Sequence, residues 1–216
     1  MKRRSKLLIL VAVAAALCCL LVMLTSGANA SGTCGAEGDN LTWTFDSSTG
    51  KLTISGTGAM GDYNSSSSVP WYSYRNSIKA VEIANGVTSI SNFAFFYCSS
   101  LTSIEIPSSV TSIGDWAFSN CSSLTSIEIP SSVTSIGAGA FQYCSSLTSI
   151  TIPDGVTSIG NYAFSYCRSL TSIEIPSSVT SIRYNAFDGC SSLMSVTFGE
   201  NSQMCIRDRH RGECVH

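Results

Sequence analysis

The fold is decided by residues 101–123, which read L-T-S-I-E-I-P-S-S-V-T-S-I-G-D-W-A-F-S-N-C-S-S. Residues 124–146 repeat this stretch at a step of 23 residues, as L-T-S-I-E-I-P-S-S-V-T-S-I-G-A-G-A-F-Q-Y-C-S-S. The segment Val-Thr-Ser-Ile keeps the same register and occurs at residues 87–90, 110–113, 133–136, 156–159 and 179–182. Five copies at one constant step establish an internal repeat, which predicts a chain of stacked coils.

The residue pattern of one repeat predicts the structure of one coil. Ile104 and Ile106 alternate with Glu105, as in a short strand with one buried face, and Pro107 ends that strand because it lacks an amide hydrogen. The A-F-x-x-C segment at residues 117–121 predicts a short helical or 3-10 turn on the opposite side. An L-x-x-I-x-I core in a repeat of this length is typical of a leucine-rich solenoid. The expected fold class is therefore an α/β repeat solenoid with a parallel β-sheet on one face.

Stacking places identical side chains of successive coils in columns. No coil can bury its apolar residues alone, so contacts between neighbouring coils supply nearly all of the stability. We expect the structural core to contain two such columns: Phe95, Phe118, Phe141, Phe164 and Phe187, and Cys98, Cys121, Cys144, Cys167 and Cys190. We interpret these cysteines as small buried hydrophobes with free thiols, and leave disulfides within the column and metal binding as alternatives.

The start of the chain has a different composition. Residues 1–30 combine four basic residues near the N-terminus, an apolar run and the small-x-small motif Ala28-Asn29-Ala30, which together predict a signal peptide. An uncleaved membrane anchor is one alternative for this segment, because the apolar run just reaches the length of a membrane span. Lipidation at Cys18 or Cys19 is a second, disfavoured because no small residue precedes either cysteine. In each case the body of the protein is expected to be secreted or on the extracellular cell surface, with no other membrane contact.

Three further segments follow. Residues 31–80 predict an N-terminal cap with a β-hairpin, since Leu41, Trp43 and Phe45 alternate with polar residues and a turn follows. Residues 81–203 form the predicted leucine-rich repeat solenoid of about five repeats. Residues 204–209, which read M-C-I-R-D-R, match a translated transposon end from a sequencing library. We therefore interpret residues 204–216 as a non-native tail that arose in sequencing.

Charge and residue content exclude several classes of function. Residues 31–203 carry five basic and twelve acidic side chains, so their surface repels the phosphate backbone of a nucleic acid. The two histidines, His210 and His216, lie in the predicted tail, and the body offers no imidazole for a Ser-His-Asp triad or an ordinary zinc site. We expect a protein that is not an enzyme and has no cofactor, no metal and no nucleic-acid partner.

One candidate for ligand contact is a column of acidic side chains, called here the glutamate column. It occupies the outward position of successive strands and consists of Glu82, Glu105, Glu128, Thr151 and Glu174. Adjacent carboxylates about 5 Å apart in water repel each other by on the order of 1 kcal/mol. A solvated face, contact with a basic partner and divalent cation binding are left open, whereas a glycosidase pair is disfavoured because its two carboxylates need different environments.

A second candidate is a column of aromatic side chains just before the cysteines, called here the tyrosine column. It consists of Tyr97, Tyr143 and Tyr166, and we expect it on the convex side of the solenoid. Packing between neighbouring coils is one interpretation, because large rings bury much apolar area. Stacking on a sugar or on a protein partner is the other.

Several motifs together resemble the BspA-like leucine-rich repeat surface proteins. They are C-G-x-x-x-x-N-L-T-W-T-F-D at residues 34–46, L-T-I-S-G-T-G-A-M at residues 52–60, Pro70-Trp71-Tyr72, and the repeat I-P-x-x-V-T-S-I-x-x-x-A-F-x-x-C-x-S-L. The resemblance covers residues 34 to about 200. It implies a right-handed solenoid on secreted or surface-attached proteins of host-associated microbes, several of which are adhesins. It implies no catalytic residue and no single partner.

The expected function is binding. We expect a secreted or cell-surface protein that adheres to an extracellular protein or glycan on a host or neighbouring cell. The alternative is a structural spacer that carries a catalytic or anchoring module beyond the end of this sequence. An enzyme within these residues is a third, disfavoured interpretation, and it would depend on Glu105 or Glu128.

Overall fold

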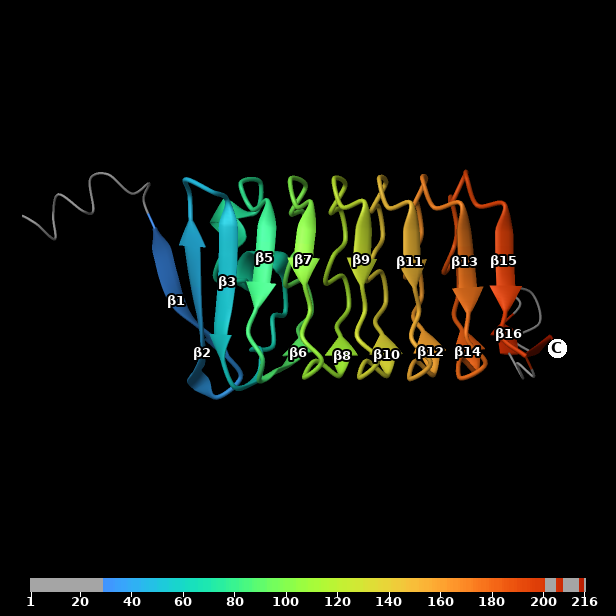
Figure 1. Ribbon diagram of the computed structural model, residues 1–216, viewed down its shortest axis with the longest axis horizontal. Helices are drawn as coiled ribbons and strands as arrows, with labels where there is room; N and C mark the ends of the chain where they lie inside the picture. Colours follow the sequence, from blue (N-terminus) through green and yellow to red (C-terminus); the bar gives the residue numbers. More distant parts are fainter. Residues whose placement is uncertain (1–28, 201–204, 208–213, 216) are drawn as a thin grey trace, which may run out of the picture.

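The structure, a computed structural model, describes residues 29–200, 205–207 and 214–215 (Figure 1). It is a β-solenoid in which each coil contributes a strand to each of two rows of parallel strands. Most of the predicted signal peptide, residues 1–28, lies outside the described residues, and so does most of the predicted tail.

The first row of strands comes from the L-T-S-I-E-I segments. The row consists of three sheets whose strands pair in parallel at the repeat step, so that Val81 lies beside Ile104 and Ile127 lies beside Ile150. The strands follow one another along the solenoid (Figure 1). They are β5 (Ala80–Ile83), β7 (Ser103–Glu105), β9 (Ser126–Glu128), β11 (Ser149–Thr151), β13 (Ser172–Ile175) and β15 (Ser195–Phe198).

The Val-Thr-Ser-Ile segments form a second row, which the sequence analysis did not predict. In each segment Val and Ile are mainly buried while Thr is exposed, and β-branched residues favour such half-buried strands. The row pairs in parallel, with Ser135 beside both Ser112 and Ser158. Its strands are β4 (Gly58–Ala59), β6 (Val87–Ile90), β8 (Ser112–Ile113), β10 (Ser135–Ile136), β12 (Ser158–Ile159), β14 (Ser181–Ile182) and β16 (Cys205–Arg207), with β17 (Cys214–Val215) antiparallel at the edge.

Turns take the place of the predicted helical or 3-10 turns. Residues 81–200 contain no helix, and the 3-10 helices of the described chain are η1 (Ser66–Ser68) and η2 (Tyr72–Tyr74), which precede the repeats. The amide of Phe118 donates to the carbonyl of Ala140 in the next coil, over 2.8 Å, instead of to a carbonyl of its own turn. Trp116 and Asn120 on either side have φ of 58° and 63°, which a right-handed helix excludes. The predicted repeat solenoid with a parallel β-sheet is confirmed, whereas the helical part of the predicted α/β class was wrong, because the repeats of the described chain are built from strands and turns.

The N-terminal segment continues the first row of strands. β1 (Ala30–Gly35), β2 (Gly38–Asp46) and β3 (Lys51–Gly56) pair antiparallel in sequence order, and β3 pairs in parallel with β5. Trp43 and Trp71 are buried, with their rings edge to face at 6.0 Å. Trp71 also stacks on Phe95 and donates from Nε1 to the carbonyl of Ala94, over 2.7 Å. This segment thus shares one core with the first coil.

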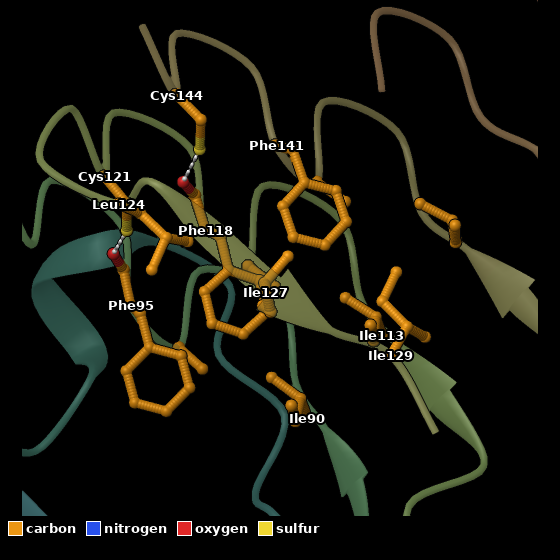
Figure 2. Close-up of a cluster of buried hydrophobic side chains, with 14 of the residues drawn as sticks. Ile90, Phe95, Ile113, Phe118, Cys121, Leu124, Ile127, Ile129, Phe141 and Cys144 are labelled. Carbon is orange, nitrogen blue, oxygen red and sulfur yellow. Dashed lines mark hydrogen bonds between the residues drawn. The ribbon is translucent and has the colours of Figure 1, made fainter. Parts of the chain in front are cut away.

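The phenylalanine column forms the centre of the solenoid (Figure 2). The ring centroids of Phe118 and Phe141 lie 5.3 Å apart with an angle of 3° between the planes, and Phe95 and Phe164 extend the stack on either side. These four rings are fully buried. Phe187 stacks on Phe164 at 5.4 Å but is only partly buried, because it belongs to the last complete coil of the described chain.

The cysteine column lies beside the rings, and its thiols are free. Cys121 donates from Sγ to the carbonyl of Phe95 over 3.2 Å, and Cys144 donates to that of Phe118 (Figure 2). Burial raises the pKa of the Cys144 thiol to about 12, so the thiol stays protonated and able to donate. Cys190 makes the same bond but is only partly buried, for the same reason as Phe187.

Candidate ligand-binding surfaces

The glutamate column lies on the exposed face of the first row of strands. Strand pairing places Glu105 beside Glu82, and Thr151 beside Glu128. On β13 the exposed Glu174 lies between the buried Ile173 and Ile175, so the alternation of the strand turns the carboxylate outward. The structure therefore places the predicted residues in the outward position of the first row.

A cation of the chain itself sits at the N-terminal end of this column. The Nζ of Lys51 on β3 forms an ion pair with Oε2 of Glu82. The hydrogen bond and the charge of Glu82, with a smaller effect of Glu105, raise the pKa of Lys51. This is the single ion pair within residues 29–200, so the carboxylates of Glu105, Glu128 and Glu174 form no ion pair with a basic side chain of that range, although Lys51 also feels the charge of Glu105.

The strand positions next to the column hold small side chains. The outward positions two residues earlier in these strands hold serine, and Ser103, Ser126 and Ser149 are all exposed. Because these side chains are small, they do not shield the neighbouring glutamates on the exposed face of the first row of strands. Metal binding gains no support, because the described part of the chain contains no group of three or more His, Cys, Asp or Glu residues placed to hold an ion.

The tyrosine column lies on the turns at the A-F segments. Tyr97, Tyr143 and Tyr166 have φ of 59°, 60° and 59°, and each donates its amide to a carbonyl of the next coil over 2.7 to 2.9 Å. The rings of Tyr143 and Tyr166 stack with centroids 4.8 Å apart. Tyr97 and Tyr143 are 48% and 40% exposed, whereas Tyr166 is half-buried.

Sequence analysis missed that this column requires left-handed backbone. For a residue with a Cβ this conformation costs roughly 1–2 kcal/mol. Asn120 and Gly189, which tolerate it better, occupy the same position in two other coils with φ of 63° and 69°. A Cβ on Gly189 would lie 2.7 Å from Cδ1 of Tyr166, so the tyrosine ring covers the next coil. The recurrence of Gly and Asn at one repeat position was the signal that could have revealed this.

A solenoid of stacked coils that displays columns of like side chains along its length defines the class of solenoid repeat proteins. The family model of the BspA type leucine rich repeat region matches residues 68–204 in six copies. The chain belongs to this family. Proteins of the family have a protein-interaction role and are typically extracellular or surface-associated, and their fold is typically a non-enzymatic binding scaffold.

Solved structures of bacterial proteins are similar to this chain. The T. pallidum leucine rich repeat protein is 25% identical with a TM-score of 0.57, and the match covers 75% of this chain and 86% of that one. A leucine-rich repeat protein from Bacteroides ovatus ATCC 8483 is 26% identical with a TM-score of 0.50, over 78% of this chain and 54% of that one. A leucine rich cell surface protein from Faecalibacterium prausnitzii A2-165 is 28% identical with a TM-score of 0.50, over 79% and 55%. The match thus spans about half the length of the last two.

A search of curated proteins and a search of the described chain for membrane-spanning helices each gave a negative result. No curated protein matches this chain. No helix within the described residues has the length and apolar composition needed to cross a membrane.

Proposed function

We propose that the protein is a secreted or surface-displayed binding protein, without enzymatic activity, that adheres to an extracellular protein or glycan on a host or neighbouring cell. The observation that carries the proposal is the repetition of exposed side chains at one coil spacing, in the glutamate column and in the tyrosine column. Family membership supports a role in molecular interaction.

Repetition suits adhesion because a partner with repeated features can contact several coils at once. Each further contact is then made within an existing complex, so weak single contacts add up to strong attachment. The carboxylates of Glu105, Glu128 and Glu174 favour a partner with basic side chains, since Lys51 already shows a cation held at Glu82. The tyrosine column offers rings to a partner on another side of the coil.

The test is binding of the purified full chain to immobilised matrix proteins, to mucins and to whole cells, measured by surface plasmon resonance and flow cytometry. A triple variant with Glu105→Gln, Glu128→Gln and Glu174→Gln removes the free charges of the glutamate column. Its matched control carries Asp62→Asn, Asp154→Asn and Asp188→Asn, which remove the same charge from exposed positions outside the column.

We expect saturable binding by the unaltered chain and by the control. Weaker binding by the triple glutamate variant assigns contact to the glutamate column, and unchanged binding assigns it to another surface. Absence of saturable binding to any of these targets would overturn the proposal.

A structural spacer is the second candidate. It is supported by the observation that the match spans 54% and 55% of two longer relatives, which leaves room in such proteins for further modules. Sequencing of the gene and its flanking DNA tests it. A catalytic or anchoring domain after the repeats would favour the spacer, and a reading frame that ends within the repeats would exclude it.

A further inference from the structure

We infer that Tyr97, Asn120 and Tyr143 form a subsite for the ring of a neutral pyranose sugar. The inference rests on the proposed binding function and specifies its ligand class. It starts from the tyrosine column, in which successive coils place Tyr97, Asn120, Tyr143, Tyr166 and Gly189 at one repeat position.

The backbone is the same at each step of this column. The amide of Asn120 donates to the carbonyl of Gln142, just as the amides of Tyr97 and Tyr143 donate to carbonyls of their next coils. Tyr143 and Tyr166 show that rings on successive coils stack, with centroids 4.8 Å apart and planes at 11°. Asn120 carries no ring, so the column has one ring-free position between Tyr97 and Tyr143. The backbones of these two tyrosines are two coils apart, about 10 Å.

The two tyrosine rings next to the ring-free position are more exposed to solvent than the third ring, Tyr166. Tyr166 has Tyr143 on one side and the backbone of Gly189 on the other, and it is half-buried. Tyr97 and Tyr143 flank the ring-free position and keep 48% and 40% of their surface in solvent. Tyr97 packs edge to face against Phe96, with ring centroids 4.7 Å apart, and Tyr143 stacks on Tyr166. The left-handed backbone would accept Gly or Asn at less strain, so the exposed surface that remains on each ring is available for one further contact. A bound ring would supply it.

The chemistry around Asn120 favours a sugar over an aromatic side chain. A pyranose has C–H faces that pack on tyrosine rings and hydroxyl edges that need hydrogen-bond partners. The Nδ2 of Asn120 donates to Oγ of the buried Ser119 over 3.1 Å, which orients the carboxamide of this half-buried residue. Its Oδ1 and second N–H are the groups that would meet hydroxyls. Residues 29–200 hold five basic and twelve acidic side chains, and this excess of negative charge disfavours sialylated or sulfated sugars.

The test uses the full chain and a panel of neutral oligosaccharides of N-acetylglucosamine, galactose and mannose, with isothermal titration calorimetry and saturation-transfer NMR. Asn120→Tyr fills the ring-free position with the residue that three other coils carry there, so it should fold and block the subsite. Tyr143→Asn removes a flanking ring and introduces the residue of the preceding coil. Tyr162→Asn is the matched control, because Tyr162 is also left-handed and Asn185 fills its position in the next coil.

We expect the unaltered chain and Tyr162→Asn to bind at least one sugar of the panel, and Asn120→Tyr and Tyr143→Asn to bind it at least about tenfold more weakly. Thermal unfolding checks that each variant is folded. Equal sugar binding by Asn120→Tyr would overturn the subsite. Binding to proteins but to no sugar would overturn the sugar and leave the proposed function intact, whereas binding to no target of either kind would overturn both.

Discussion

The thiol of Cys144 donates a hydrogen bond across a coil boundary to the carbonyl oxygen of Phe118, over 3.2 Å. The same oxygen also accepts from the amide of Cys121, over 3.1 Å, within its own coil. Both lone pairs of a carbonyl in a dry core are thereby used. The cysteine column therefore ties neighbouring coils together by hydrogen bonds, in addition to filling space.

Removal of one thiol should weaken the solenoid. Cys144→Ala deletes the donor and the buried sulfur, and we expect it to lower the free energy of unfolding by about 1–2 kcal/mol. Cys144→Ser keeps a donor at the same position and separates the hydrogen bond from the lost volume. Urea unfolding followed by circular dichroism measures both variants. An alanine variant as stable as the unaltered chain would show that the bond contributes nothing.

The buried thiols should make stability depend on alkaline pH. Burial raises the pKa of Cys98 and of Cys144 to about 12, whereas the value for an exposed thiol is 9.0. Above pH 9 the unfolded chain releases these protons and the folded chain keeps them. We expect the thiol contribution to be fully present below pH 9 and to be lost as the pH rises from 9 toward 12, measured as urea midpoints across this range.

The matched control for this pH dependence is the double variant Cys98→Ala and Cys144→Ala, which should show a shallower fall above pH 9. Alkylation provides a second measurement, since the thiolate is the reactive form. Iodoacetamide should leave the four buried thiols of the cysteine column unlabelled in the folded chain and label them in urea; these are Cys98, Cys121, Cys144 and Cys167. Rapid labelling of these four thiols in the folded chain at neutral pH, mapped by mass spectrometry, would contradict the structure.

The position of a coil should set the effect of deleting its ring. Phe118 has a stacked ring on each side, and we expect Phe118→Ala to lower the free energy of unfolding by about 3–5 kcal/mol. Phe187 stacks on Phe164 alone and is partly buried, so Phe187→Ala should cost less. Urea unfolding of the two variants side by side tests this. Equal losses would mean that the last coil is covered as well as the central ones.

Gly139 should tolerate no side chain while Trp116 is present. Its φ is 59°, and a Cβ there would lie 2.6 Å from Cε3 of Trp116 in the preceding coil. We expect Gly139→Ala to destabilise the chain by about 1–3 kcal/mol, partly through the backbone and partly through this contact. In a Trp116→Ala background the penalty should shrink to the backbone part. If the destabilising effects of Gly139→Ala and Trp116→Ala simply add in the double variant, the predicted contact between the two positions is wrong.

The repeat step made the first row of strands and the two core columns predictable. Burial at Phe118 and Cys121 follows from one coil stacking on the next, and a constant period records this directly in the sequence. The second row was missed because Val-Thr-Ser-Ile is too short for its alternation to distinguish a strand from a turn. The helical prediction failed because the amide of Phe118 pairs with the next coil, a contact that local spacing does not contain.

The candidate surfaces also combine features that the sequence predicts with features that depend on contacts between distant segments. The outward positions of Glu105 and Glu128 follow from strand alternation alone. The ion pair of Lys51 with Glu82 depends on the register between β3 and β5, which is fixed by backbone pairing between segments distant in sequence. The difference in solvent exposure between Tyr97 and Tyr166 depends on which residues of the neighbouring coils cover each ring, and the sequence alone does not show this.

The pairing of Ser135 with both Ser112 and Ser158 shows that a coil meets the coil before it and the coil after it in the same way. A whole repeat can therefore be gained or lost without rebuilding the interior. Recombination between tandem copies of the coding sequence would change the reach of the molecule in uniform increments, while each increment keeps its chemistry. Selection can thus adjust the length of such a protein independently of what any one of its modules recognises.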